Sequence, residues 1–201
     1  MNVSNSKIDQ DLISAQKHQY NKDKKVLIWE VFGIFFITII GSLFHFVFEW
    51  LGHWGPIGGF FPVNESVWEH LKLPFWSILI FTLIEYNFIK NESKNVIFGK
   101  AIASLISIMT IIVVFYSYTS LLNIELLVID IFSFIIGIVL GQLASYKIIT
   151  REKLSYWFSS LSWTFIILLG FTFLLFTYFP PKLPIFQDST TGLYGILDHI
   201  L

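Results

Sequence analysis

Histidines and carboxylates gather in one short stretch of the sequence, between Gly41 and Pro74. His45, Glu49 and His53 are spaced four residues apart, so they share one face if a single helix carries all three. Imidazole nitrogens and carboxylate oxygens together are ligands for zinc, and also for iron and manganese. The spacing therefore predicts a divalent-metal site, with zinc as the first candidate and one open position where a water is activated.

A second group of ionisable residues follows a turn rich in glycine and proline at 52–62. Asn64 is a favoured N-cap, so we expect a new helix to begin there. On such a helix Glu65 and Glu69 share a face, and Pro74 kinks the helix as it enters the membrane. The predicted metal ligands are then His45, Glu49, His53, His70 and Asp130, and the predicted catalytic carboxylates are Glu69 and Glu65.

Simpler explanations exist for some of these residues. Glu65 favours the positive end of a helix dipole, and Glu69 with Lys72 would form a surface pair at i, i+3. These explanations do not cover His45, Glu49 and Asp130, because an ionised group within a spanning helix costs about 2.5–3.5 kcal/mol. A hydrogen bond between His45 and Asp130, joining two helices, is the structural alternative.

Glu30 and Glu85 form a second set in the other half of the predicted bundle. With Asp130 they would make a polar track, which is typical of a small proton- or cation-coupled transporter. A third alternative is a non-catalytic binding or assembly protein whose polar residues only hold helices together. A metal-dependent hydrolase acting on a lipid-like or envelope substrate, a transporter and an assembly protein all stay open on the sequence alone.

Membrane-spanning helices must position these groups. The chain of 201 residues is 55% hydrophobic and only 13% charged, whereas soluble domains carry about 25% charged residues. The net charge of −1 gives no reason to expect nucleic acid as a partner. The chain has no cysteine, which excludes disulfides, thiolate nucleophiles and cysteine-ligated metals. The expected partner is the lipid bilayer.

Five segments are long and apolar enough to cross a bilayer, which takes about 20 residues. We expect an all-α bundle at 26–181, preceded by a tail at 1–25 and followed by a C-terminal segment at 182–201. Gly137 and Gly141 form a GxxxG pair, which favours close helix packing and offers a face for oligomerisation. The expected spans are about 26–50, 73–90, 99–122, 125–147 and 155–179.

Lysine and arginine predict the orientation. Eleven of them lie in the tail and in the loops after the second and fourth spans, and only Lys72 and Lys182 lie on the other side. The positive-inside rule then places the N-terminus in the cytoplasm and the C-terminus outside a plasma or inner membrane. The His/Glu-rich stretch faces outward, and the C-terminal segment would bring Asp188 or His199 near it by folding back.

The stretch PVNESVWEHLKLPFW, with HFVFEW before it and PPKLPIFQDSTTGLYGI near the C-terminus, carries a resemblance. It resembles a family of uncharacterised prokaryotic multi-span membrane proteins, a domain of unknown function. The resemblance extends from about Val26 to the end of the chain. It implies a polytopic inner-membrane protein, and it supplies no activity and no catalytic residue.

Overall fold

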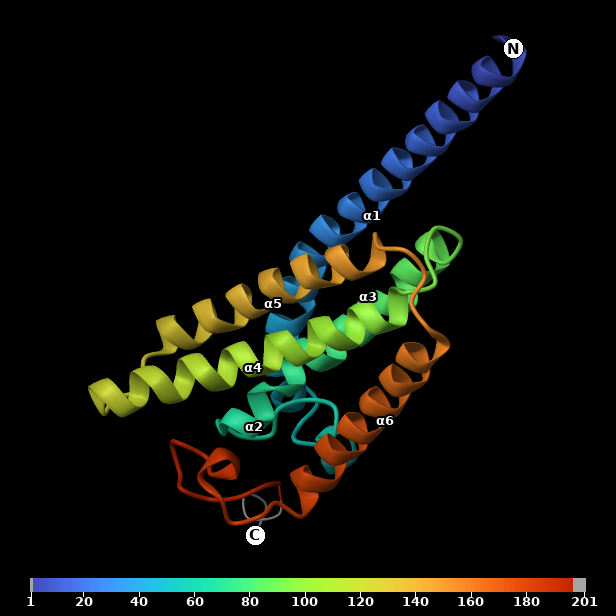
Figure 1. Cartoon of the computed structure of the whole chain (residues 1–201). Helices are drawn as coiled ribbons and strands as arrows, with labels where there is room; N and C mark the ends of the chain where they lie inside the picture. Colours follow the sequence, from blue (N-terminus) through green and yellow to red (C-terminus); the bar gives the residue numbers. More distant parts are fainter. Residues whose placement is uncertain (1, 197–201) are drawn as a thin grey trace.

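The computed structural model describes residues 2–196, so His199 lies outside the described residues. Over this range the regular structure is helical, apart from one isolated bridge between Gln187 and Tyr194. Five helices are long and apolar enough to cross a membrane, which confirms the expected all-α bundle. They are α1 (Asn2–Trp50), α3 (Lys72–Ile89), α4 (Val96–Leu122), α5 (Leu127–Ile149) and α6 (Tyr156–Tyr178) (Figure 1).

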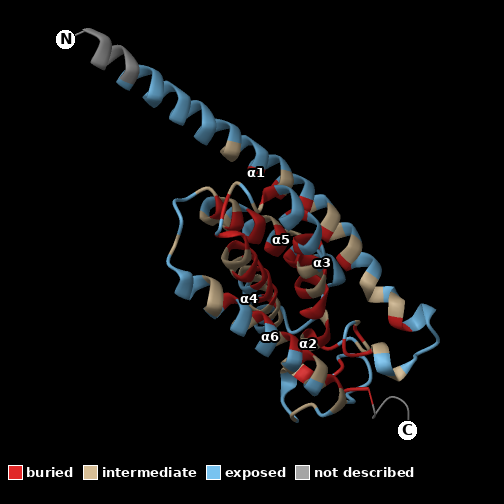
Figure 2. Cartoon of the chain, turned by 90° about the vertical axis from the view of Figure 1, so that its right-hand side faces the viewer, coloured by how far each residue is buried: buried red, intermediate tan, exposed pale blue. Residues whose placement is uncertain are grey.

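Helix α1 has 49 residues and extends far beyond the bundle (Figure 1). At 1.5 Å per residue it is about 73 Å long, more than twice the roughly 30 Å hydrocarbon core of a bilayer. The segment 1–25, expected as a separate tail, is over its described part the beginning of this helix. No glycine or proline precedes Gly33, so nothing in the sequence interrupts the helix there. Residues 8–20 of the projecting part are exposed, whereas buried residues gather in the bundle (Figure 2).

The C-terminal end of α1 differs from the expected continuation through Gly52. The Gly52 N–H donates to the Glu49 carbonyl at 2.9 Å, and the His53 N–H donates to the Phe48 carbonyl at 3.0 Å. Gly52 adopts a φ of 67°, so this is a Schellman cap, which needs a left-handed residue after the helix. His53 also has a positive φ, of 59°, and its ring packs on Phe48. His53 therefore leaves the helix face that carries His45.

Three short helices lie at the same end of the bundle. Helix η1 (Gly55–Ile57) is in the first loop, which joins α1 to α2, α2 (Val67–His70) directly precedes α3, and η2 (Pro184–Phe186) is in the C-terminal segment. The N-cap of α2 is Ser66 and not Asn64, because the Ser66 hydroxyl accepts the Glu69 N–H at 3.3 Å. The Asn64 side chain instead accepts the Ser66 N–H at 2.9 Å, which shapes the turn before the helix.

The helix breaks at Leu71, between α2 and α3. Pro74 accounts for the break, because it has no N–H to offer the His70 carbonyl and its ring clashes with that carbonyl. The kink expected from Pro74 is therefore present, displaced toward the preceding turn. It sets α2 apart from α3 (Figure 1). His70, the last residue of α2, contacts His45 near the end of α1 at 3.1 Å.

Helices α4 and α5 pack closely side by side (Figure 1). A Cβ on Gly137 would lie 3.0 Å from the Ser107 carbonyl oxygen, and one on Gly141 would lie 2.7 Å from the Ala103 carbonyl oxygen. The Ser107 hydroxyl also donates to the Gly137 carbonyl at 3.0 Å. The GxxxG face proposed for oligomerisation is thus occupied by α4 of the same chain.

Candidate functional site

Three of the predicted residues converge where α1 ends and α2 begins. His45 comes from α1, Glu65 from the loop before α2 and His70 from α2, and one ligand atom from each lies within 4.8 Å of the others. The two imidazole Nε2 atoms are 3.1 Å apart. Glu65 Oε2 lies 3.6 Å from His45 Nε2 and 3.3 Å from His70 Nε2. The three side chains are 29–46% exposed, so a solute can reach them.

These separations suit a tetrahedral metal ion. Two ligand atoms that each lie about 2.0–2.1 Å from a tetrahedral zinc are about 3.3 Å apart. The three separations in the protein range from 3.1 to 3.6 Å and bracket that value. Two imidazole nitrogens facing each other at this distance need a shared proton or a shared cation, because their lone pairs repel.

The orientation of the His70 ring also suits a ligand. His70 Nδ1 lies 2.9 Å from the Ser66 carbonyl oxygen, which can only accept a hydrogen bond. Nδ1 therefore carries the proton, and in the neutral ring Nε2 presents its lone pair to the cluster. A second nitrogen held by a backbone carbonyl is the usual arrangement of metal-binding histidines.

Glu65 is prepared to act as an anion. When the imidazoles are protonated, hydrogen bonds from His45 and then from His70 lower the pKa of the Glu65 carboxyl below its usual range, although partial burial acts in the opposite direction. The carboxylate is ionised at neutral pH as a result. The cluster therefore offers two imidazole nitrogens and one carboxylate oxygen.

Other predicted ligands lie outside this cluster. Glu49 is exposed on α1 and His53 packs on Phe48. Asp130 accepts a hydrogen bond from the Tyr118 hydroxyl at 2.9 Å, which joins the ends of α4 and α5. The His45–Asp130 hydrogen bond considered from the sequence is replaced by contacts of His45 with His70 and Glu65.

Glu69 lies in a separate, buried ion pair. Its Oε2 accepts from Lys72 Nζ at 2.6 Å and from the Val63 N–H at 3.0 Å, and neither charged side chain is more than 2% exposed. The expected surface pair is therefore a buried one. Lys72 Nζ also donates to the Gly58 carbonyl and to the Thr177 hydroxyl, so the pair ties the first loop to α6. Glu69 is committed to this contact and fixes the position of α2.

A third ionic cluster lies in the opposite half of the bundle. Lys100 Nζ is 2.8 Å from Glu30 Oε2 and 2.7 Å from Glu85 Oε2, and the three side chains are 0–3% exposed. The Ser145 hydroxyl donates to the other oxygen of Glu30 at 2.7 Å. The Glu85 contact is an ion pair without hydrogen-bond geometry, and Oε1 of Glu85 has no partner among the described residues. The structure thus brings Glu30 and Glu85 together and leaves Asp130 elsewhere.

Sequence reasoning missed both buried lysines. Lys72 and Lys100 stand next to apolar runs and were counted as loop cations for the orientation. The i, i+3 spacing of Glu69 and Lys72 was the one local signal. For Lys100 no local signal exists, because its partner Glu30 is on α1 and its partner Glu85 is on α3.

Comparison with known proteins identifies a family and no activity. A family model described as "Family of unknown function (DUF6512)" matches residues 16–196. Comparison with curated proteins and with solved structures found no significant match. The matched range includes all three ionic clusters and every long helix except the first residues of α1. Because it covers most of the chain, the protein belongs to this family of unknown function.

Proposed function

We propose that this membrane protein binds a divalent metal ion, zinc first, between His45, Glu65 and His70. The proposal rests on one observation, the mutual separations of 3.1–3.6 Å between the three ligand atoms. The exposed side chains allow the ion to enter, and the carbonyl of Ser66 holds His70 in the orientation that a ligand requires.

The proposed role of the ion is hydrolysis of a lipid-like or envelope substrate. Two histidines and one glutamate are the ligand set of well-known zinc hydrolases, in which a water takes the fourth position. Zinc would lower the pKa of that water toward neutrality and supply the nucleophile. Glu65 would act as a ligand in this scheme, while Glu69, held by Lys72, supports α2 and hence His70.

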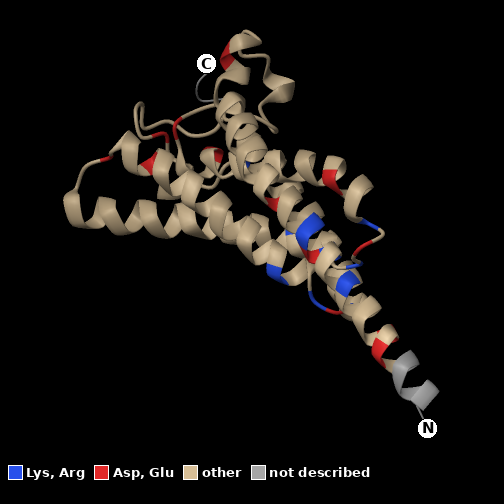
Figure 3. Ribbon diagram, turned by 90° about the horizontal axis from the view of Figure 1, so that it is seen from above, with Lys and Arg blue, Asp and Glu red and all other residues tan. Residues whose placement is uncertain are grey.

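The distribution of basic residues supports an outward-facing site. Most lysines and arginines lie toward the half of the molecule from which α1 projects (Figure 3). Helix α2, which carries His70 of the cluster, lies toward the opposite end of the bundle, with the segment after α6 (Figure 1). By the positive-inside rule the cluster would then face away from the cytoplasm.

Metal analysis of the purified full-length protein tests the proposal. After removal of loosely bound ions and incubation with zinc, we expect a stoichiometry near one in the wild type. The variants His45→Ala and His70→Ala should lose it, Glu65→Gln should bind zinc more weakly, and His53→Ala serves as the matched control because His53 lies outside the cluster. Equal zinc content in all five proteins, or none in the wild type, would refute the metal site.

The hydrolytic step needs its own test. Zinc-loaded protein in mixed micelles should cleave an ester- or amide-linked lipid, and Glu65→Gln should abolish the cleavage. Zinc at full occupancy without cleavage of any such lipid would leave metal binding in place and remove hydrolysis from the proposal.

A second candidate function is proton- or cation-coupled transport, supported by the Glu30–Lys100–Glu85 cluster. Two carboxylates share one ammonium there, so one further proton or cation would balance the charge. In proteoliposomes with a pH gradient, flux that is lost in Glu85→Gln but kept in Glu49→Gln would support transport. Absence of both flux and metal would favour the third alternative, a binding or assembly protein.

A further inference from the structure

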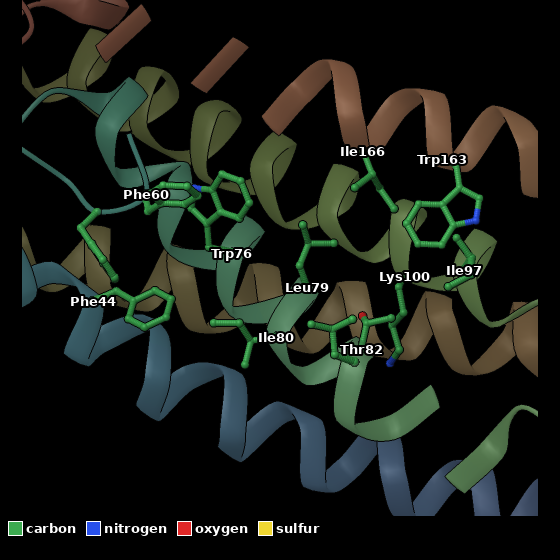
Figure 4. Close-up of a pocket in the computed structure, with 12 residues that line it drawn as sticks. Phe44, Phe60, Trp76, Leu79, Ile80, Thr82, Ile97, Lys100, Trp163 and Ile166 are labelled. Atoms are coloured by element: carbon green, nitrogen blue, oxygen red, sulfur yellow. The ribbon is translucent and has the colours of Figure 1, made fainter. Parts of the chain in front are cut away.

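A groove opens on one side of the bundle between α3, α4 and α6. Its apolar part has a volume of about 400 Å³. Figure 4 shows that aromatic and aliphatic side chains from α1, the first loop, α3, α4 and α6 surround it. Lys100 contributes to its wall, while the Lys100 ammonium is held by Glu30 and Glu85 inside the bundle. The apolar lining includes Phe44, Phe60, Trp76, Leu79 and Ile166.

A second cavity of about 620 Å³ continues this groove toward the loops after α3 and α5. Thr82, Leu83, Ile97 and Trp163 line both cavities, so the two form one groove. The lining of the second cavity is more polar than that of the first. It adds Tyr86, Asn87, Ser155 and Ser159, and the two basic residues Lys94 and Lys153.

Two lysines line the polar end of the groove. Lys94 and Lys153 are exposed, and neither forms an ion pair with another residue in the range 2–196. No carboxylate lines either part of the groove. The nearby Glu92 carboxylate is taken by Lys25 at 2.8 Å. An anionic group is therefore the complement of this end.

The length of the apolar part matches one leaflet of a bilayer. On α3 it extends from Trp76 to the region of Leu83, and the polar part begins near Tyr86. Ten residues separate Trp76 from Tyr86, which is about 15 Å along a helix. Half of a hydrocarbon core is also about 15 Å.

We propose that this groove binds one anionic glycerophospholipid, taken from the leaflet on the side of Lys94 and Lys153. The phosphate lies between these two lysines, with hydroxyl and amide donors such as Ser155 and Asn87 beside it. One acyl chain follows α3 to Trp76 and Phe60. The site is separate from the His45–Glu65–His70 cluster and does not depend on metal binding.

Native mass spectrometry of the full-length protein in detergent tests this assignment. Phosphatidylglycerol and phosphatidylcholine with identical acyl chains are the two probes, because they differ only in the headgroup, which is anionic in the first and zwitterionic in the second. The wild type should bind one phosphatidylglycerol more tightly than it binds phosphatidylcholine. The double variant Lys94→Gln/Lys153→Gln should lose about 30-fold in phosphatidylglycerol affinity, since each lysine near an anionic lipid adds about fivefold.

Two further variants separate the headgroup site from the acyl groove. Leu83→Trp places a large side chain in the groove and should weaken both lipids equally. Lys17→Gln/Lys24→Gln removes the same charge from the exposed part of α1 and should change neither. Thermal unfolding of each variant shows that the fold is kept.

Three results would overturn the proposal. The first is equal affinity of the wild type for the two lipids, which would indicate ordinary boundary lipid. The second is an equal loss of phosphatidylglycerol affinity in the Lys94/Lys153 and Lys17/Lys24 double variants, which would indicate a general charge effect. The third is a dimer that forms through α3 and α6 and excludes lipid from the groove.

Discussion

Replacing Lys100 with methionine should destabilise the protein strongly, because it leaves two buried carboxylates without a cation. The Lys100, Glu30 and Glu85 side chains are 0–3% exposed, so water does not screen these charges. Removing one partner of a buried ion pair costs about 3–5 kcal/mol. We expect a loss of that size in the free energy of unfolding, measured by chemical denaturation in detergent micelles.

The surface pair of Lys25 and Glu92 provides a matched control. Its N···O distance of 2.8 Å equals that between Lys100 and Glu30, but its side chains are 44% and 21% exposed. Lys25→Met should therefore cost about 0–1 kcal/mol. The two pairs differ mainly in burial. Equal losses of unfolding free energy in Lys25→Met and Lys100→Met would therefore refute the view that burial makes the Lys100–Glu30–Glu85 contacts strong.

The two carboxylates of this cluster should not be equivalent. Glu30 accepts from Lys100 and from the Ser145 hydroxyl, whereas Glu85 has only the Lys100 ion pair and an oxygen without a partner. Glu30→Gln should cost more than Glu85→Gln, which leaves the Lys100–Glu30 pair intact. A larger loss in Glu85→Gln would show that Glu85 is the principal counter-ion of Lys100.

Three other outcomes are expected. Gly141→Leu should destabilise the protein by about 1–3 kcal/mol in thermal or chemical unfolding, because a Cβ there would lie 2.7 Å from an α4 carbonyl oxygen. Gly55→Ala should be close to neutral, because the nearest atom to its Cβ would lie 4.0 Å away. Zinc affinity should fall between pH 7 and pH 5 as histidine ligands are protonated, and Glu65→Gln should bind more weakly with its pH midpoint at lower pH, because the ionised Glu65 carboxylate stabilises the protonated ring of His70. An unchanged midpoint in that variant would argue against an ionised Glu65. Lys72→Met should release the loop 52–66 and speed its cleavage in limited proteolysis, whereas Lys182→Met should not. Equal cleavage rates in the two variants would show that the buried Lys72–Glu69 pair does not hold that loop in place.

The helical bundle could be predicted from the sequence because membrane spanning is a local property. An apolar run of about 20 residues is visible without any knowledge of its neighbours. The ends of α3, α4, α5 and α6 lie within three residues of the expected bounds. The length of α1 could not be predicted in the same way, because its first half is polar all round and shows no clear apolar face.

The candidate site could be predicted in part. The sequence predicts His45 and His70 as ligands, because two helix ends joined by a short connection carry them. It predicts Glu65 as a catalytic carboxylate and not as a ligand, whereas the structure places a Glu65 oxygen among the ligand atoms. Helical spacing groups His53 with His45, but this fails because the left-handed Gly52 ends the helix before His53. Glu49 stays on α1 with His45, and its side chain is exposed and lies outside the cluster. Partners that come from distant helices, as for Lys100, follow from tertiary packing and leave no pattern in the sequence.

Because α1 is one continuous helix, it connects the two ends of the bundle directly. His45 is carried by the same helix as Lys22, which contacts the Thr150 carbonyl at the end of α5 at 3.3 Å. About 35 Å of helix separates the two residues. A rotation of the part of α1 that projects from the bundle would therefore also move His45 on the other side of the bilayer. The contact of Lys22 with the end of α5 would be the point about which the helix turns.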